Sequence, residues 1–294
     1  MQPTELDNIV NTFICGRCEE VLADFPDNCI NQIITSPPYA DLRNYGVDDS
    51  SIKPDEYIEW FLPKARQFKR VLTNNGSFIL NINDKVVNGE QHLFVFELLI
   101  ALVKDIGFKF VRDYIWNNPA TPPNAFSRGK LGRTKKSHEY CFWFSVSDSW
   151  TFNLDAIRKP YSKGMQKYLK GHGKGNREDN KRPSTHSFNC EKQWTDHGGS
   201  DPGSVILLAN TSSNDTFTKL CKERGIRHPA RFPEKLAEFF ILSGSSIGDI
   251  VLDPFSGTGT TAISAQRNNR NWIGIDANSD YCDISRERLN IEFP

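Results

Sequence analysis

The stretch Thr35-Ser36-Pro37-Pro38-Tyr39 constrains the fold of this chain more than any other. It follows a run, Gln32-Ile33-Ile34, that is typical of the end of a buried parallel strand. Proline lacks an N–H donor and keeps the preceding residue extended, so the pair cannot continue a sheet ladder. We therefore expect a strand over Ile30–Thr35 that carries this stretch to the carboxyl edge of an open α/β sheet, where such sheets place their chemistry.

The chemistry that this stretch offers is two hydrogen-bond acceptors beside an aromatic ring. The Ser36 hydroxyl and the Pro37 carbonyl are the acceptors, and Tyr39 supplies the ring. An exocyclic amino group on a flat base has two N–H bonds to hold and a face to stack. The sequence predicts that residues 36–39 bind such a group.

A second motif, Asp253–Thr261, predicts a strand, a glycine turn and a helix. Its glycines allow a ligand to approach the backbone, the helix N-terminus attracts an anion, and Asp276 ends the next predicted strand. The pattern also satisfies the G-x-G-x-x-A fingerprint of dinucleotide enzymes. Taken alone, the motif fits either S-adenosylmethionine or a nicotinamide cofactor.

Together the two motifs resemble those of the beta-group DNA amino-methyltransferases, as found in restriction-modification systems, with the catalytic motif first. The resemblance implies a circularly permuted Rossmann-like α/β fold with a doubly wound, mostly parallel sheet, S-adenosylmethionine as cofactor, and DNA as substrate. The serine that begins the catalytic motif resembles the N4-cytosine branch more than the N6-adenine branch. The resemblance implies catalytic roles for Ser36, Pro37, Pro38 and Tyr39. It also implies cofactor contacts from Asp253, Phe255, Gly257, Thr258, Gly259, Thr260, Thr261 and Asp276. The chain has Gly16-Arg17 where the family usually has Gly-Asp.

Charge is distributed unevenly, although the net charge is zero. Residues 128–182 contain 14 Lys and Arg against five Asp and Glu, a net charge of +9. We expect residues 156–203 to form a basic target-recognition insert and residues 1–155 with 204–294 to form the catalytic domain. Basic residues interleaved with aromatic ones suit phosphates and unstacked bases. The expected DNA contacts are Arg43, Tyr45, Arg128, Lys130, Arg133, Lys135, Lys136 and Lys174.

Several alternatives stay open at this point: an N6-adenine DNA methyltransferase, an RNA methyltransferase, a nicotinamide-dependent oxidoreductase, or a nucleic-acid-binding protein without activity. The odd count of seven cysteines predicts reduced thiols, and we expect no metal site. No apolar run approaches the length of a membrane span, which predicts a cytoplasmic protein. The resemblance implies a monomer or homodimer and a cognate restriction endonuclease without stable association.

The remaining periodicity predicts the helices and strands that surround the two motifs. A helix is expected over Asp55–Leu72, with a kink or break at Pro63 because proline removes a helical hydrogen bond. Asn74-Asn75-Gly76 predicts a turn before a strand over Ser77–Ile82. The other expected elements are strands over Thr12–Ile14, Phe108–Trp116, Glu139–Ser145, Val251–Asp253 and Trp272–Asp276, and helices over Glu19–Phe25, Leu93–Ile106, Thr260–Arg267 and from Pro233.

Overall fold

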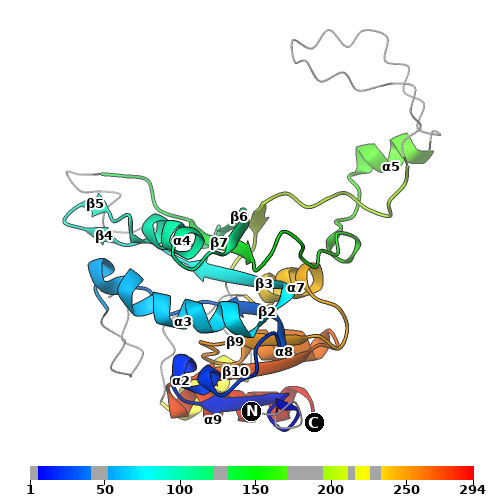
Figure 1. Cartoon of the computed structure of the whole chain (residues 1–294). Coiled ribbons are helices and arrows are strands. Elements are labelled where there is room, and N and C mark those ends of the chain that lie inside the picture. Colours follow the sequence, from blue (N-terminus) through cyan, green and yellow to red (C-terminus); the bar gives the residue numbers. More distant parts are fainter. Residues whose placement is uncertain (1–5, 41–51, 122–131, 171–194, 211–215, 226–232) are drawn as a thin grey trace. The chain divides into compact units, whose positions relative to one another are not determined.

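A mixed sheet of eight strands forms the centre of the computed structural model, which describes residues 6–40, 52–121, 132–170, 195–210, 216–225 and 233–294. The strand order is β1-β10-β9-β2-β3-β7-β6-β8, and five of the seven neighbouring pairs are parallel (Figure 1). The strands are β1 (Thr12–Cys15), β2 (Ile30–Thr35), β3 (Leu72–Ile82), β6 (Lys109–Asn117), β7 (His138–Ser145), β8 (Val205–Leu207), β9 (Ile250–Asp253) and β10 (Asn271–Asp276).

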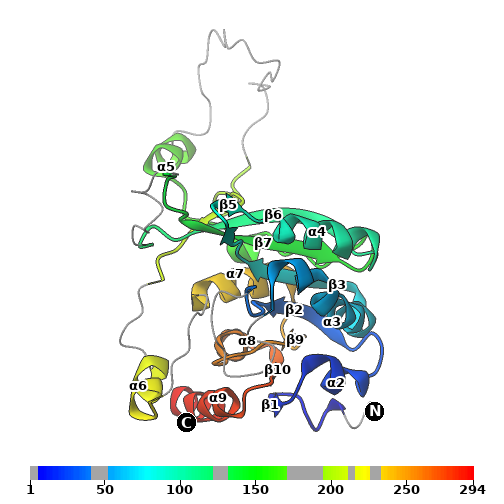
Figure 2. The same ribbon diagram turned by 90° about the vertical axis from the view of Figure 1, so that its left-hand side faces the viewer.

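Both faces of this sheet are covered by helices, because successive strand residues point to opposite sides. Ile33 belongs to a buried cluster that includes residues of α2, α3 and α4, whereas its neighbour Ile34 belongs to another that includes residues of α7 and α8. Figure 2 shows α3 on one side of the sheet and α7 and α8 on the other. The helices in the same part of the chain as this sheet are α2 (Cys18–Ala23), α3 (Tyr57–Val71), α4 (Phe94–Lys104), α6 (Thr216–Glu223), α7 (Glu234–Gly244), α8 (Thr260–Arg267) and α9 (Ser279–Glu292). The chain is therefore a doubly wound α/β protein, as the sequence predicted.

The first and last parts of the chain lie side by side. β1 pairs in parallel with β10 from Thr12↔Ile273 to Cys15↔Asp276. The catalytic strand β2 pairs with β9 on one side and with β3 on the other. The permuted order expected from the motifs is thus confirmed, because β9 and β10, near the C-terminus, lie between β1 and β2, near the N-terminus, in one sheet.

Two local expectations differ from the structure. Of the kink or break expected at Pro63, the break is absent: helix α3 continues through this residue, which lies on its exposed side, where water can satisfy the carbonyl that loses its donor. The expected turn at residues 74–76 lies inside β3, at an irregularity where Ile30 pairs with Leu72 but Gln32 pairs with Ser77. The short hairpin of β4 (Val86–Val87) and β5 (Glu90–Gln91) was not expected from the sequence pattern.

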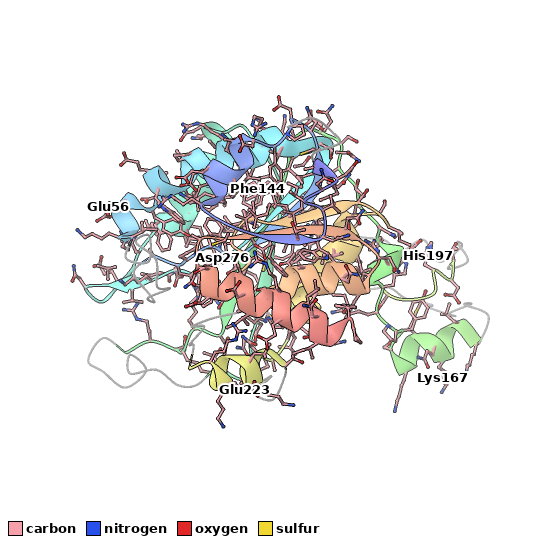
Figure 3. The ribbon with its side chains drawn as sticks, turned by 90° about the horizontal axis from the view of Figure 1, so that it is seen from below. Glu56, Phe144, Lys167, His197, Glu223 and Asp276 are labelled. Carbon is pink, nitrogen blue, oxygen red and sulfur yellow. The ribbon has the colours of Figure 1, made fainter. Side chains whose placement is uncertain are left out.

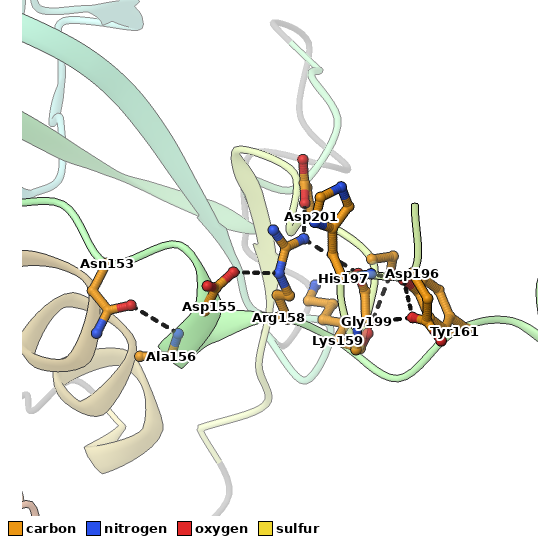
Figure 4. A network of polar contacts seen from close by, with 12 residues as sticks. Asn153, Asp155, Ala156, Arg158, Lys159, Tyr161, Asp196, His197, Gly199 and Asp201 are labelled. Atoms are coloured by element: carbon orange, nitrogen blue, oxygen red, sulfur yellow. Dashed lines mark hydrogen bonds and ion pairs between the residues drawn. The ribbon is translucent and has the colours of Figure 1, made fainter. Parts of the chain in front are cut away.

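The chain divides into two compact units, residues 1–152 with 204–294 and residues 153–203. In the second unit, helix α5 (Lys163–Lys170) exposes its lysines, and Lys159 pairs with Ser200 in an isolated bridge. Arg158 contacts the carboxylates of Asp155 and Asp201 (Figure 4). The recognition role expected for residues 156–203 stays a prediction.

The remaining global expectations concern membranes and thiols. In the described part of the chain, no helix combines the length and apolar character that crossing a bilayer requires. The six cysteines that the structure describes are all free thiols.

Candidate active site

The carboxyl ends of β10, β9 and β2 meet at one edge of the sheet. β9 lies between the other two strands, with Gly274↔Asp253 on one side and Ile33↔Leu252 on the other. The chain winds in opposite directions on the two sides of the β9–β2 boundary, which makes this a topological switch point. The strand order therefore brings the catalytic and glycine motifs together.

The catalytic motif begins directly after β2 and is held by side chains from other elements. The Ser36 hydroxyl is part-exposed and lies 3.0 Å from the hydroxyl of Tyr39. Tyr39 is only 7% exposed. The Tyr57 hydroxyl, from α3, donates to the Pro38 carbonyl at 2.8 Å and fixes the backbone of the proline pair. Among the polar residues of this motif, Thr35 and Tyr39 are buried and Ser36 is part-exposed.

Asp253 links the two motifs from inside the core. Its carboxylate accepts from Thr35 Oγ1 at 2.7 Å and from Thr261 Oγ1 at 2.6 Å, and also from the N–H of Phe255. Burial raises the pKa of Asp253 to about 6. Because a hydroxyl has one proton, Thr261 cannot also donate to a bound carboxylate. In this arrangement the two side chains bind each other inside the core, and the cofactor contacts expected of Asp253 and Thr261 stay predictions.

The glycine turn connects β9 to α8. Gly259 has φ +74°, and a Cβ at this position would meet the ring of Phe13 at 2.8 Å. Thr258 and Thr260 are buried, and Arg288 from α9 donates to the Thr258 carbonyl at 3.1 Å. The turn thus requires glycine and points its threonine side chains into the protein.

Asp276 ends β10, beside α9 (Figure 3). Its Oδ2 accepts from the N–H of Gly257 at 2.7 Å, and its Oδ1 accepts from the N–H of Asn278 at 2.9 Å. Burial raises the pKa of Asp276 to about 6. A carboxyl group with two oxygens retains further acceptor positions beyond these two N–H bonds. Three of the expected cofactor residues are part-exposed at this edge: Phe255, Gly257 and Asp276.

The expected DNA contacts are only partly described. Lys135 is exposed and donates to the Thr121 carbonyl at 2.8 Å, and Arg133 donates to the Gly89 carbonyl. Lys136 is paired with Asp84, so its ammonium group is not directed to open solvent, and burial lowers its pKa. The phosphate contact expected of Lys136 stays a prediction. Outside the described residues lie Arg43, Tyr45, Arg128, Lys130 and Lys174.

Two polar residues beside the catalytic motif were missed by the sequence interpretation. Glu139 Oε2 lies 2.7 Å from the Tyr39 hydroxyl and accepts from Asn81 Nδ2 at 3.3 Å. Asn81 is 3% exposed on β3. Residues 77–82 and 139–145 were both expected as strands, but only their antiparallel register, with Ile82 opposite Tyr140, places Glu139 at this edge.

Comparison with known proteins identifies the family. The profile of the N6/N4 DNA methylase family matches residues 30–287. The chain belongs to this family of DNA methylases. The methylase is 33% identical over 283 residues to the type II methyltransferase M.PvuII of Proteus hauseri, covering 93% of this chain and 82% of the relative. It is 34% identical over 263 residues to the orphan methyltransferase M.BamHII of Bacillus amyloliquefaciens, covering 90% and 89%.

Solved structures agree on the fold of the methylase. The PvuII DNA methyltransferase, described as cytosine-N4-specific, matches with a TM-score of 0.73 and 26% identity over 94% of this chain and 85% of that chain. A DNA modification methylase of Thermus thermophilus in complex with S-adenosyl-L-methionine matches with a TM-score of 0.59 and 21% identity, covering 96% and 94%. The oxidoreductase alternative left open by the glycine motif is not supported.

Proposed function

We propose that this DNA methylase transfers a methyl group from S-adenosylmethionine to the N4 amino group of cytosine in DNA. The observation that carries the proposal is the part-exposed Ser36 hydroxyl at the end of β2, one strand away from the glycine turn after β9. The motif begins with serine, as in the N4-cytosine branch that it resembles. The similarity to a cytosine-N4-specific methyltransferase supports the same base.

The residues at the edge of β9 and β10 suit S-adenosylmethionine. Asp276 has acceptor positions for the ribose hydroxyls, and the part-exposed backbone of Gly257 allows close approach. The Phe255 ring lies 5.8 Å from that of Trp60, which gives an aromatic surface beside the turn. Asp253 and Thr261 support this site from the core. The cofactor supplies an activated methyl group on its sulfonium, and the protein supplies alignment.

At the target, the Ser36 hydroxyl and the Pro37 carbonyl would accept the two N–H bonds of the amino group. Its lone pair is conjugated with the ring, and these bonds favour the pyramidal nitrogen of the transition state. The base must leave the duplex to reach them. Tyr39 is the expected stacking ring, and at 7% exposure it requires a local movement to receive a base face.

Contacts with DNA are proposed for the basic residues, including Lys135 and the exposed Lys163, Lys167 and Lys170 of α5. Residues 156–203 are proposed as the target-recognition insert. The similarity to type II methyltransferases supports a role in modification of DNA. A separately acting restriction endonuclease, and a monomer or homodimer, are part of the proposal. Action on DNA in bacterial relatives supports the expected cytoplasmic location.

Methyl transfer tests this function directly. The protein is incubated with S-adenosylmethionine labelled in the methyl group and with DNA or RNA. We expect label in DNA, and a loss of roughly 10- to 1,000-fold in turnover for Ser36→Ala without loss of cofactor affinity, because one transition-state hydrogen bond is removed. Label in RNA alone, or wild-type turnover in Ser36→Ala, would contradict the proposal.

A further inference from the structure

Glu139 lies behind the catalytic motif rather than within reach of the base. It belongs to β7, which pairs antiparallel with β3. It lies next to Tyr140, which pairs with Ile82, at the edge of the sheet where Ser36 is part-exposed. We propose that Glu139 fixes the direction of the hydrogen bonds through Tyr39 to Ser36 and accepts the proton that leaves the methylated amino group. This inference rests on the proposed function and assigns a positioning residue to it.

The donors around Glu139 are arranged by Asn81. The amide nitrogen of Asn81 lies 3.3 Å from Glu139 Oε2 and 3.2 Å from the Tyr140 carbonyl oxygen. Both of these partners accept, so the nitrogen must face them. The amide oxygen of Asn81 then faces the Tyr39 hydroxyl at 3.1 Å. Tyr39 is thus offered two acceptors, of which the carboxylate is nearer at 2.7 Å and binds the proton more strongly.

The direction of the next hydrogen bond follows from this one. Since the phenol proton of Tyr39 points to an acceptor, its oxygen receives a proton from Ser36, 3.0 Å away. The serine proton is therefore directed toward Tyr39, which leaves the lone pairs of the oxygen of the part-exposed Ser36 to accept from a ligand. Such an acceptor is what a target N–H bond requires. With Glu139 replaced, Tyr39 keeps only the more distant and weaker acceptor, the amide oxygen of Asn81, so the direction of the hydrogen bond from Ser36 is held less firmly.

The same series of hydrogen-bonded groups can carry a proton after methyl transfer. As the N–C bond forms and the electron pair of the C–S bond stays on sulfur, the amino nitrogen becomes positively charged. Its proton passes to Ser36 Oγ, while the serine proton passes to Tyr39 and the tyrosine proton passes to the Glu139 carboxylate. Serine and tyrosine end neutral, and the part-exposed Glu139 carries the proton until it is lost to water.

The test uses Glu139→Gln, Tyr39→Phe and the double variant. Single-turnover transfer is measured at saturating S-adenosylmethionine on DNA that the wild-type protein methylates. We expect each single substitution to lower the rate by about 100- to 10,000-fold, the range typical of proton transfer by a positioned side chain. The double variant should be no slower than the slower single variant, because both substitutions interrupt the same series of hydrogen bonds. Affinities for DNA and cofactor should stay within about twofold, since Tyr39→Phe keeps the ring that is proposed to stack on the base and Glu139→Gln keeps the size of the side chain.

Matched controls are Glu97→Gln on the exposed side of α4 and Tyr114→Phe on β6, which should both retain the wild-type rate. Wild-type rates in Glu139→Gln, or reductions that multiply in the double variant, would overturn the inference. If Glu139→Gln folds poorly, a wild-type rate in Tyr39→Phe overturns it equally.

A stability measurement separates this inference from the proposed function. The midpoints of urea unfolding for the wild type, the two single variants and the double variant should be non-additive, because the hydrogen bond between Tyr39 and Glu139 is lost once. Additive midpoints overturn the inference whatever the activity. A wild-type protein that methylates no DNA refutes the proposed function, and the unfolding cycle still tests the hydrogen bond.

Discussion

Replacing Asp253 by asparagine tests whether this carboxylate links the two motifs by hydrogen bonds inside the core without contacting the cofactor. The side chain is 2% exposed, and burial raises its pKa to about 6. An aspartate in an unfolded chain has a pKa of about 3.9. The folded state therefore binds the proton more tightly, and the stability of the protein falls as the pH rises from about 4 to about 6.

The magnitude follows from this difference. About two pKa units at about 1.4 kcal/mol each give about 3 kcal/mol, the free energy that the ionised carboxylate costs at neutral pH. Asparagine has nearly the same shape and no charge. Its oxygen can accept from Thr35 and Phe255, and its nitrogen can donate to the oxygen of Thr261. We expect Asp253→Asn to be more stable than wild type by about 1–3 kcal/mol near pH 8 and equally stable near pH 4.

Urea unfolding at the two pH values measures this effect, with the exposed Asp283→Asn as the control that should change little at either pH. Cofactor affinity, measured by calorimetry, should be retained in Asp253→Asn and lost in Asp276→Ala. A variant that is less stable than wild type near pH 8 would contradict the free-energy cost of the ionised carboxylate. A variant that no longer binds S-adenosylmethionine would contradict the role of Asp253 as a link inside the core.

Three further substitutions have defined outcomes. Gly259→Val should lower the thermal midpoint and weaken cofactor binding in calorimetry, because it combines strain at positive φ with a clash against Phe13; an unchanged protein would show that the turn adapts. Lys135→Ala should weaken DNA binding and reduce its salt slope by about one, and a binding constant indifferent to salt would contradict this. Glu19→Gln should destabilise by about 3 kcal/mol by leaving the buried Lys64 unpaired. Burial opposes ionisation of Glu19, yet its hydrogen bonds and Lys64 lower its pKa, so this loss should shrink in acid unfolding experiments as Glu19 becomes protonated.

The sequence predicted the elements that carry the site because their patterns are local. Ile30–Thr35 and Thr260–Arg267 have the bounds expected for a buried strand and for a helix after a glycine turn. Whether Pro63 breaks the helix could not be predicted, since the cost of an interior proline depends on whether the freed carbonyl faces solvent, which only the packed helix decides.

The site itself was predicted less completely, for a related reason. Motif spacing identifies which residues stand at the end of a strand, but not which of their side chains turn inward. Thr261 was expected to bind the cofactor, and its side chain donates to Asp253 inside the core, a contact that the motif did not reveal. Glu139 carries no motif signal, because its place beside Tyr39 is created by the register of β7 against β3, between residues far apart in the sequence.

The chemical identity of the methylated nucleoside tests the central claim most directly. DNA treated with the wild-type protein and S-adenosylmethionine is digested to nucleosides and analysed by mass spectrometry, with Ser36→Ala as the matched control. The account predicts N4-methylcytosine with the wild type and far less with the variant at equal time. N6-methyladenine as the product would contradict the assignment of the serine-containing motif to cytosine, and methylated nucleosides in neither DNA nor RNA would contradict the account as a whole.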